Sequence, residues 1–292
     1  MQNYLLNPLE AYFSKVLILE SKLSITSTYL KEYSKQIIKE DREFKTLHSA
    51  ITTYRDMSLI QGGDNLFIPN CSFEMDVARL NNQIDDIISQ QGCFAVAQAY
   101  EYFETFLIDI ITEYLFHNQK NLEIIGVSAG KLIMLRTTIR EKVKRIKDGN
   151  KRRFSILRKS FSFFEQYETK NIYNYNVSLW FNLISLVRHD IVHNGQRLSN
   201  KLMEYVRENN LEKIFNEQIQ TKKIDNDISI FFKLDAADEI IHRLNGLAHF
   251  VFKSISIELG LPANVPQYIP PPLNLSKILV PSYYLKNNRL NF

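Results

Sequence analysis

Residues 186–195 contain the densest group of chemically versatile side chains in the sequence: Arg188, His189, Asp190, His193 and Asn194. Two imidazoles four residues apart would share one face of a helix and could bind zinc together. Zinc protease helices carry a Glu directly after the first His of such a pair, whereas Asp190 follows here, and no other cluster of Cys or His completes a site. A purely structural role, in which Arg188 and His193 cap or bridge helices, also fits the residue types.

The chain around this segment has the pattern of an amphipathic helix that ends just after it. Apolar residues recur at helical spacing and should face a core: Trp180, Leu183, Val187 and Ile191. Gly195 predicts the end of the helix, because Gly adopts the left-handed cap conformation at little cost. The residues that fall away from the apolar stripe are Arg188, His189, Val192 and His193. An apolar residue among polar ones on an outward face indicates a surface for a partner.

This arrangement resembles the HEPN superfamily of helical nucleases. The hallmark of that superfamily is an arginine and a histidine separated by four to six residues, usually with a polar residue directly after the arginine. Here four residues separate Arg188 from His193, and His189 is the polar follower. Asn194 with the following glycine resembles one broad branch of the superfamily, and residues 99–107 look like its earlier core helix with an embedded glutamate. The resemblance covers roughly residues 75–260.

The resemblance implies a metal-independent ribonuclease without a cofactor, in which the 2′-hydroxyl of RNA attacks the adjacent phosphate and leaves a cyclic phosphate. His193 would act as general acid or base, and Arg188 would bind the phosphate and stabilise the charge of the transition state. Asn194 and His189 would orient or assist, and Asp190 would fix a ring tautomer. Two such motifs usually face each other across a dimer in this superfamily, which implies a homodimer.

The same resemblance bears on the biological role and on partners. Nucleases of this superfamily commonly serve as toxins or antiviral effectors in prokaryotes, so an antitoxin or a defence-system protein could be a partner. Some of its toxins carry a tyrosine two residues after the histidine, which a partner nucleotidyltransferase modifies; Gly195 stands there in this chain, so that regulation is not expected. Two other functions remain open, a non-catalytic module that binds RNA or nucleotides and a helical interaction scaffold.

Glu104 is a carboxylate beside the apolar stripe of a predicted helix over residues 76–117. A carboxylate in this place needs a cation or hydrogen-bond donors. Arg188 is the candidate partner that the resemblance implies. A partly exposed Glu104 that reaches water is an equal alternative.

A basic segment spans residues 140–159, where ten Lys and Arg residues stand against two carboxylates. Such a concentration of positive charge suits a phosphate backbone. The candidate RNA-binding residues are Lys144, Arg145, Arg152 and Arg153. The alternative is a solvated helix face without a partner.

The composition of the 292-residue chain is that of a packed globular protein, with 45% hydrophobic and 12% aromatic residues. Two cysteines, Cys71 and Cys93, fit free thiols in a reducing cytoplasm. We expect no secretion signal, because residues 1–20 carry no basic region followed by an uninterrupted apolar run. We expect no membrane segment either, because acidic residues interrupt the most hydrophobic stretch, residues 103–116.

The hydrophobic periodicity predicts an all-α protein, mainly a helical bundle, with a small β-hairpin at residues 219–234. Residues 4 to 60 have the pattern of one or two helices, with a bend at the Ser/Thr-rich stretch 21–28. We expect an N-terminal helical arm over residues 1–62, a HEPN-like helical domain over 63–260 and an extended tail over 261–292. Six of the eight prolines lie in that tail and exclude a regular helix there.

Overall fold

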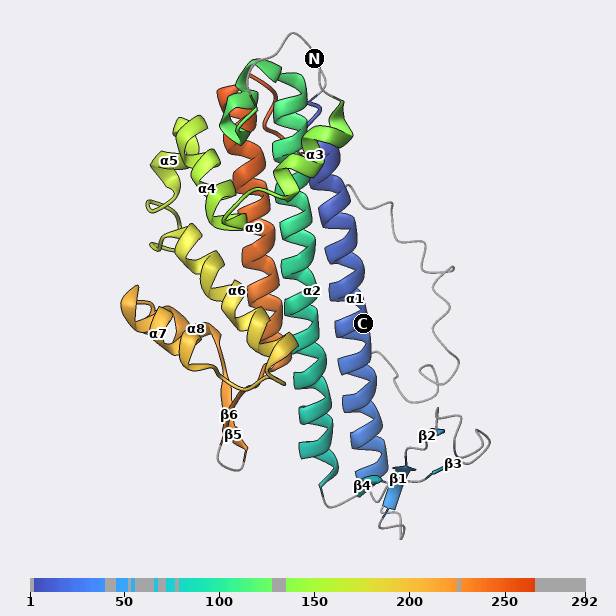
Figure 1. The fold of residues 1–292 in the computed structure, drawn as a ribbon. Helices are drawn as coiled ribbons and strands as arrows, with labels where there is room; N and C mark the ends of the chain where they lie inside the picture. Colours follow the sequence, from blue (N-terminus) through green and yellow to red (C-terminus); the bar gives the residue numbers. More distant parts are fainter. Residues whose placement is uncertain are drawn as a thin grey trace, which may run out of the picture.

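Three long helices lie side by side and form the body of the molecule (Figure 1). They are α1 (Leu6–Lys39), α2 (Leu80–His117) and α9 (Leu234–Glu258). The computed structural model describes residues 3–39, 46–51, 54–55, 66–67, 72–76, 79–127, 135–224 and 227–265. The buried residues of α2 are distributed around the helix, which fits its place between α1 and α9.

Shorter helices connect α2 to α9 and pack along one side of the long helices (Figure 1). In chain order they are η2 (Gln119–Ile125), α3 (Arg136–Lys144), α4 (Gly149–Ser160), α5 (Ser162–Tyr167), α6 (Val177–His193), α7 (Asn200–Glu208) and α8 (Glu212–Gln218). The hairpin of β5 (Thr221–Ile224) and β6 (Asp227–Ile230) follows, with antiparallel pairing from Thr221 opposite Ile230 to Ile224 opposite Asp227. The prediction of an all-α protein with a small hairpin in this region is confirmed.

The prediction of helix over residues 4 to 60 is correct only as far as Lys39. The Ser/Thr-rich stretch neither breaks nor ends α1, which is continuous from Leu6 to Lys39. Four short strands then form two antiparallel pairs: β1 (Thr46–Ile51) with β4 (Ser72–Asp76), and β2 (Tyr54–Arg55) with β3 (Leu66–Phe67). Residues 51–54 are Ile-Thr-Thr-Tyr, and β-branched and aromatic residues of this kind favour strands. The structure of this segment depends on pairing between strands that are far apart in the sequence. The local hydrophobic periodicity of the sequence could not predict that pairing.

Two hydrophobic clusters lie in the part of the chain that the structure describes, and the larger one joins α1, α2 and α9. Leu5, Leu9 and Tyr12 of the N-terminal segment are buried together with Phe103 of α2 and Phe252 of α9. The helix α1 therefore packs as part of the bundle. The expected domain boundary at residue 62 lies outside the described residues and stays a prediction, as does the structure of the tail from residue 266 onward.

The described part of the chain contains no helix that is both long enough and apolar enough to cross a membrane.

Candidate functional site at the end of α6

The helix α6 ends where the sequence predicts. Its apolar stripe is buried: Trp180, Leu183, Val187 and Ile191 are each no more than 3% exposed. At the start of the helix the side chain of Asn176 accepts a hydrogen bond from the backbone NH of Leu179 (3.0 Å), which caps it. At the other end Gly195 adopts a φ of 58°, the left-handed conformation that stops the helix after His193.

Asp190 fastens the end of α6 to the chain that follows. It is fully buried, and its carboxylate accepts hydrogen bonds from Asn194 Nδ2 (2.6 Å) and from the backbone NH of Ser199 (2.8 Å). The following loop is tied to the hairpin, because the NH of Leu198 donates to the carbonyl of Ile228 (2.9 Å). The two carboxylate oxygens are thus engaged by Asn194 and Ser199. This bonding corrects the expectation that Asp190 orients a histidine ring, and gives Asp190 and Asn194 the role of holding the motif in place.

Arg188 pairs with Glu101 of α2 and not with Glu104. Arg188 Nη2 lies 2.5 Å from Glu101 Oε1, and the two side chains are 27% and 41% exposed. The Nε atom of Arg188 is buried without a hydrogen-bond partner. The proposed Arg188–Glu104 pair is therefore wrong. The signal for Glu101 was present in the sequence, since both Arg188 and Glu101 fall on the outward side of their apolar stripes.

Glu104 instead belongs to a polar network between α2 and α4. Arg153 Nη1 lies 3.1 Å from Glu104 Oε1, and the same arginine donates to the carbonyl of Lys144 (2.9 Å) and to Asn150 Oδ1 (2.6 Å). The side chain of Arg153 is 3% exposed. Arg153 is therefore a buried structural residue, which corrects its assignment to RNA binding.

The network continues from α2 into the motif helix. Asn150 Nδ2 donates to the hydroxyl of Tyr100 (2.9 Å), and this hydroxyl donates to Ser185 Oγ on α6 (3.0 Å). Burial raises the pKa of Tyr100, so its hydroxyl keeps its proton. Three helices are thus joined by hydrogen bonds one turn before Arg188. Tyr100 and Asn150 carry no signal in the sequence, because only the tertiary fold brings them together.

The histidines lie on the outer surface, as the helical spacing predicts. His189 and His193 are both exposed, and the centres of their rings are 4.9 Å apart. Val192 is 45% exposed on the same helix. On the neighbouring helix α2, Phe94 is 53% exposed and shares a face with Glu101, seven residues further on. We call this surface the motif face, defined by Arg188, His189, Val192, His193, Phe94 and Glu101.

The other three predicted RNA-binding residues, Lys144, Arg145 and Arg152, are more exposed than Arg153. Lys144 is exposed, and the side chain of Arg145 is 82% exposed beside Glu141. Arg152 is partly buried, and its guanidinium donates to the carbonyl of Ile124 (3.4 Å). Lys144 and Arg145 are therefore the members of the predicted RNA-binding set that can reach a phosphate without rearrangement.

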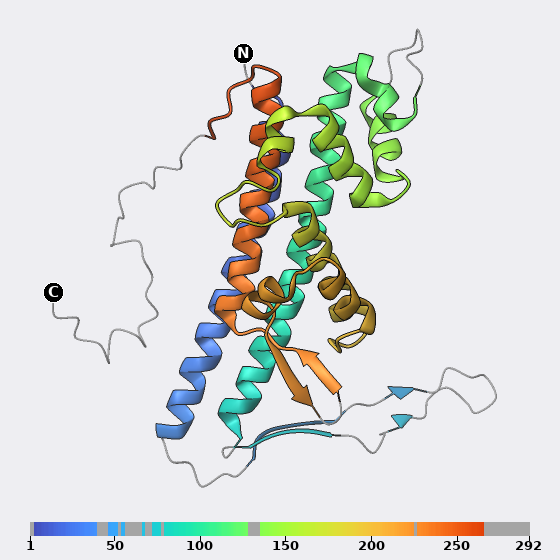
Figure 2. The ribbon, with the colours of Figure 1, turned by 90° about the vertical axis from the view of Figure 1, so that its left-hand side faces the viewer.

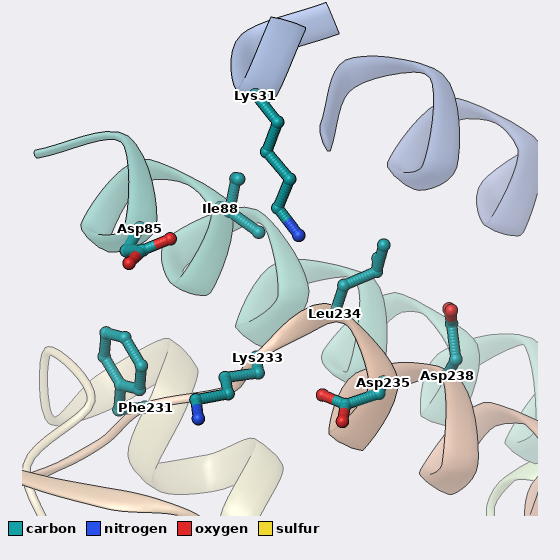
Figure 3. Close-up of a pocket in the computed structure, with 8 residues that line it drawn as sticks. All are labelled: Lys31, Asp85, Ile88, Phe231, Lys233, Leu234, Asp235 and Asp238. Carbon is teal, nitrogen blue, oxygen red and sulfur yellow. The ribbon is translucent and has the colours of Figure 1, made fainter. Parts of the chain in front are cut away.

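A hollow of about 410 Å³ lies where α1, α2 and the start of α9 meet (Figure 3). Its charged residues are mixed, with Lys31 and Lys233 near Asp85, Asp235 and Asp238. Burial raises the pKa of Asp238. Figure 3 shows that Asp85 and Asp235 come from different helices and lie at different sides of the hollow. Across the residues that the structure describes, no group of three or more His, Cys, Asp or Glu side chains is placed to hold a metal ion.

No protein-family model matches the chain, and neither does any curated protein or solved structure with which it was compared.

Proposed function

We propose that the protein is a metal-independent endoribonuclease of the HEPN type that acts as a homodimer, with Arg188 and His193 as its catalytic residues. The observation that carries the proposal is the placement of both residues on the motif face. They stand at the end of a helix that the bundle, Asp190 and the Tyr100–Ser185 hydrogen bond hold rigidly. A rigid scaffold with exposed reactive groups at its edge is what a catalytic site requires. Within this proposal the enzyme works in the cytoplasm as a toxin or an antiviral effector.

The proposed chemistry assigns one role to each residue. His193 exchanges a proton with the 2′-hydroxyl or with the leaving oxygen, a role open to an imidazole that is exposed at the end of α6. Arg188 exchanges Glu101 for the scissile phosphate and stabilises the charge of the transition state. The exchange costs little free energy, because the Arg188–Glu101 pair is partly exposed to water, where ion pairs contribute weakly.

The experiment that tests this function compares single-stranded RNA with DNA of the same sequence, both in EDTA. We expect the RNA to be cut and the DNA to stay intact, because DNA lacks the 2′-hydroxyl that acts as nucleophile. Loss of cutting in EDTA, or cutting of the DNA, would contradict the proposal.

The homodimer is supported by the apolar residues of the motif face. Phe94 and Val192 are about half exposed; Phe94 stands seven residues before Glu101 on α2, and Val192 stands four residues after Arg188 on α6, so each shares a helix face with one member of the pair. Exposed apolar residues rimmed by polar ones mark protein interfaces. A two-fold contact through this surface would bring two Arg188–His193 pairs together.

Val192→Asp should dissociate the dimer, because it places an unpaired carboxylate in an apolar contact. We expect the dimer dissociation constant to rise at least about tenfold in sedimentation velocity runs. The matched control is Ile257→Asp, since Ile257 is 43% exposed, close to the 45% of Val192, but lies on another helix, at the C-terminal end of α9. A wild-type chain that stays monomeric at micromolar concentration would contradict the proposed assembly.

The basic segment should provide non-specific affinity for RNA. Lys144→Glu combined with Arg145→Glu should weaken RNA binding and reduce the slope of log affinity against log salt by about two, because each lost phosphate contact lowers the slope by roughly one. The readout is fluorescence anisotropy of labelled RNA over a series of salt concentrations. Lys213→Glu on α8, where the side chain is 85% exposed, is the control. An unchanged salt slope would make the segment a solvated surface only.

One observation favours a second candidate, a non-catalytic module that binds RNA. Glu101 already neutralises the charge of Arg188, so a phosphate would have to displace Glu101 to bind that arginine. RNA binding that depends on salt, without cleavage under any condition, would favour this module over the nuclease.

A further inference from the structure

A groove of about 840 Å³ lies far from the motif face, between α5, the loop that follows it, and α9. Trp180, at the start of α6, forms part of the lining of the groove. It stands thirteen residues before His193 and is therefore roughly 20 Å from His193 along the helix. The volume falls in the range of small-molecule binding sites.

Aromatic rings dominate the walls of this groove. Tyr173 and Tyr175 stack with their ring centres 5.5 Å apart, and Phe163 and Tyr167 lie 4.7 Å apart on the other side. Tyr167 and Tyr173 are partly accessible, at 37% and 40% exposed, whereas Tyr175 is only 9% exposed. Planar rings that remain open to solvent can stack on the flat face of a ligand.

The loop that carries Tyr173 is held in shape by Asn171. Its Nδ2 atom donates to the carbonyls of Glu168 (3.1 Å) and Tyr175 (2.7 Å), and its Oδ1 atom accepts from the backbone NH of Tyr173 (3.0 Å). The stacking surface is therefore built before any ligand arrives, which lowers the entropy cost of binding.

The charged groups that line the groove are all cationic. Lys170, Arg243 and Lys253 line it together with His249, and no carboxylate does. Arg243 lies over the ring of Tyr173 at 4.4 Å and over Tyr175 at 5.7 Å, while its Nε donates to Glu239 outside the lining. Burial and the nearby Lys253 lower the pKa of His249, which fits a site whose charge is already positive. A ligand that matches these walls has a flat aromatic part and a negative charge.

We propose that this groove binds the nucleobase and phosphate of a nucleotide. The base would stack among the tyrosines, and the phosphate would lie between Lys170 and Lys253. Proteins that bind single-stranded nucleic acid use these two interactions: bases stack on aromatic side chains, and basic side chains neutralise the phosphates. The nucleotide can be free in solution or part of an RNA strand, and the two sources share this chemistry. The proposal does not depend on the nuclease activity, because it concerns a separate surface.

Gly246 of α9 offers a way to fill the groove without removing any of these side chains. It lines the groove, and a Cβ atom added there would have no other atom within 4 Å. Gly246→Leu therefore places a bulky side chain in open space. Leucine also has a higher helix propensity than glycine, so the helix should be kept.

Binding can be followed by the fluorescence of Trp180, which lines the groove and is the single tryptophan of the chain. The probes are AMP, adenosine, inorganic phosphate and a short 2′-O-methyl oligoribonucleotide, which cannot be cut through its 2′ position. Isothermal titration calorimetry serves as a second readout. We expect AMP or the oligonucleotide to bind at least about tenfold more tightly than adenosine or phosphate, since only they supply both parts. Binding of AMP identifies a free nucleotide as the ligand; binding of the oligonucleotide alone identifies a strand.

Two variants decide whether the binding is in the groove. The first is Gly246→Leu, and the second combines Lys170→Gln with Lys253→Gln. Each should raise the dissociation constant of the probe that binds by at least about tenfold. Lys213→Gln, on the exposed face of α8, should leave it unchanged. Circular dichroism and thermal unfolding check that each variant is folded. The proposal is overturned if neither AMP nor the oligonucleotide binds the wild-type chain with a dissociation constant below about 1 mM. It is also overturned if Gly246→Leu and the double lysine variant bind them as tightly as the wild type does.

Discussion

His193→Ala should abolish RNA cleavage by this protein and leave its fold intact. The side chain is exposed at the end of α6, so its loss opens no cavity in the core. Removal of a general acid or base costs about 10²- to 10⁴-fold in rate. Arg188→Ala should reduce the rate by about 10²- to 10³-fold through the loss of charge stabilisation. The double variant should be no slower than the worse single variant, because both residues act on one transition state.

The control for these variants is His242→Ala. His242 is also an exposed histidine, but it lies on α9 and contacts the carbonyl of Asp238, away from the motif face. Initial rates on labelled single-stranded RNA, with circular dichroism as a check on folding, give the comparison. Full activity in His193→Ala, or equal losses in His193→Ala and His242→Ala, would remove the assigned role.

Arg153→Ala should destabilise the protein more than an alanine at any of the other predicted RNA-binding residues. It leaves Asn150 Oδ1 and the carbonyls of Val143 and Lys144 without their donor, in a place where the arginine is 3% exposed. It also removes the cation beside Glu104, which keeps a hydrogen bond from Asn150 Nδ2 (3.1 Å). Each buried group that is left unsatisfied costs about 1–3 kcal/mol in the free energy of unfolding. Urea denaturation monitored by circular dichroism measures this loss.

The matched control lies in the same segment. Arg145→Ala removes the same type of side chain from a position that is 82% exposed, so the free energy of unfolding should hardly change. The pair of variants separates burial from charge. Equal stability of the two variants would show that the Glu104–Arg153 network does not hold α2 and α4 together.

The sequence predicted those parts of the molecule that depend on local periodicity. The stripe of Trp180, Val187 and Ile191, the stop at Gly195 and the outward position of His193 all follow from 3.6 residues per turn and from the backbone freedom of glycine. The hairpin near residues 221–230 is similarly marked by the turn-forming sequence Asp225-Asn226-Asp227 between two short segments.

Features that depend on contacts between distant segments could not be predicted in the same way. The predicted pair of Arg188 and Glu104 is replaced by two pairs, Arg188–Glu101 and Arg153–Glu104, since the choice between two carboxylates on α2 depends on how α6 and α4 cross that helix. Arg153 has the sequence environment of a surface arginine, and only the packing of α4 against α2 buries it. The groove beside Tyr173 also had no sequence signal, because its cations come from the loop after α5 and from α9.

The chemical identity of the RNA ends after cleavage in EDTA tests the proposed mechanism most directly. Mass spectrometry of a cut oligoribonucleotide should find a 2′,3′-cyclic phosphate on one fragment and a 5′-hydroxyl on the other, because the 2′-hydroxyl is the nucleophile and no metal-bound water takes part. An oligonucleotide with a single 2′-deoxy residue at the cleaved position should stay intact. Fragments with a 5′-phosphate, or cleavage at the 2′-deoxy position, would contradict the proposal that Arg188 and His193 catalyse transesterification of RNA.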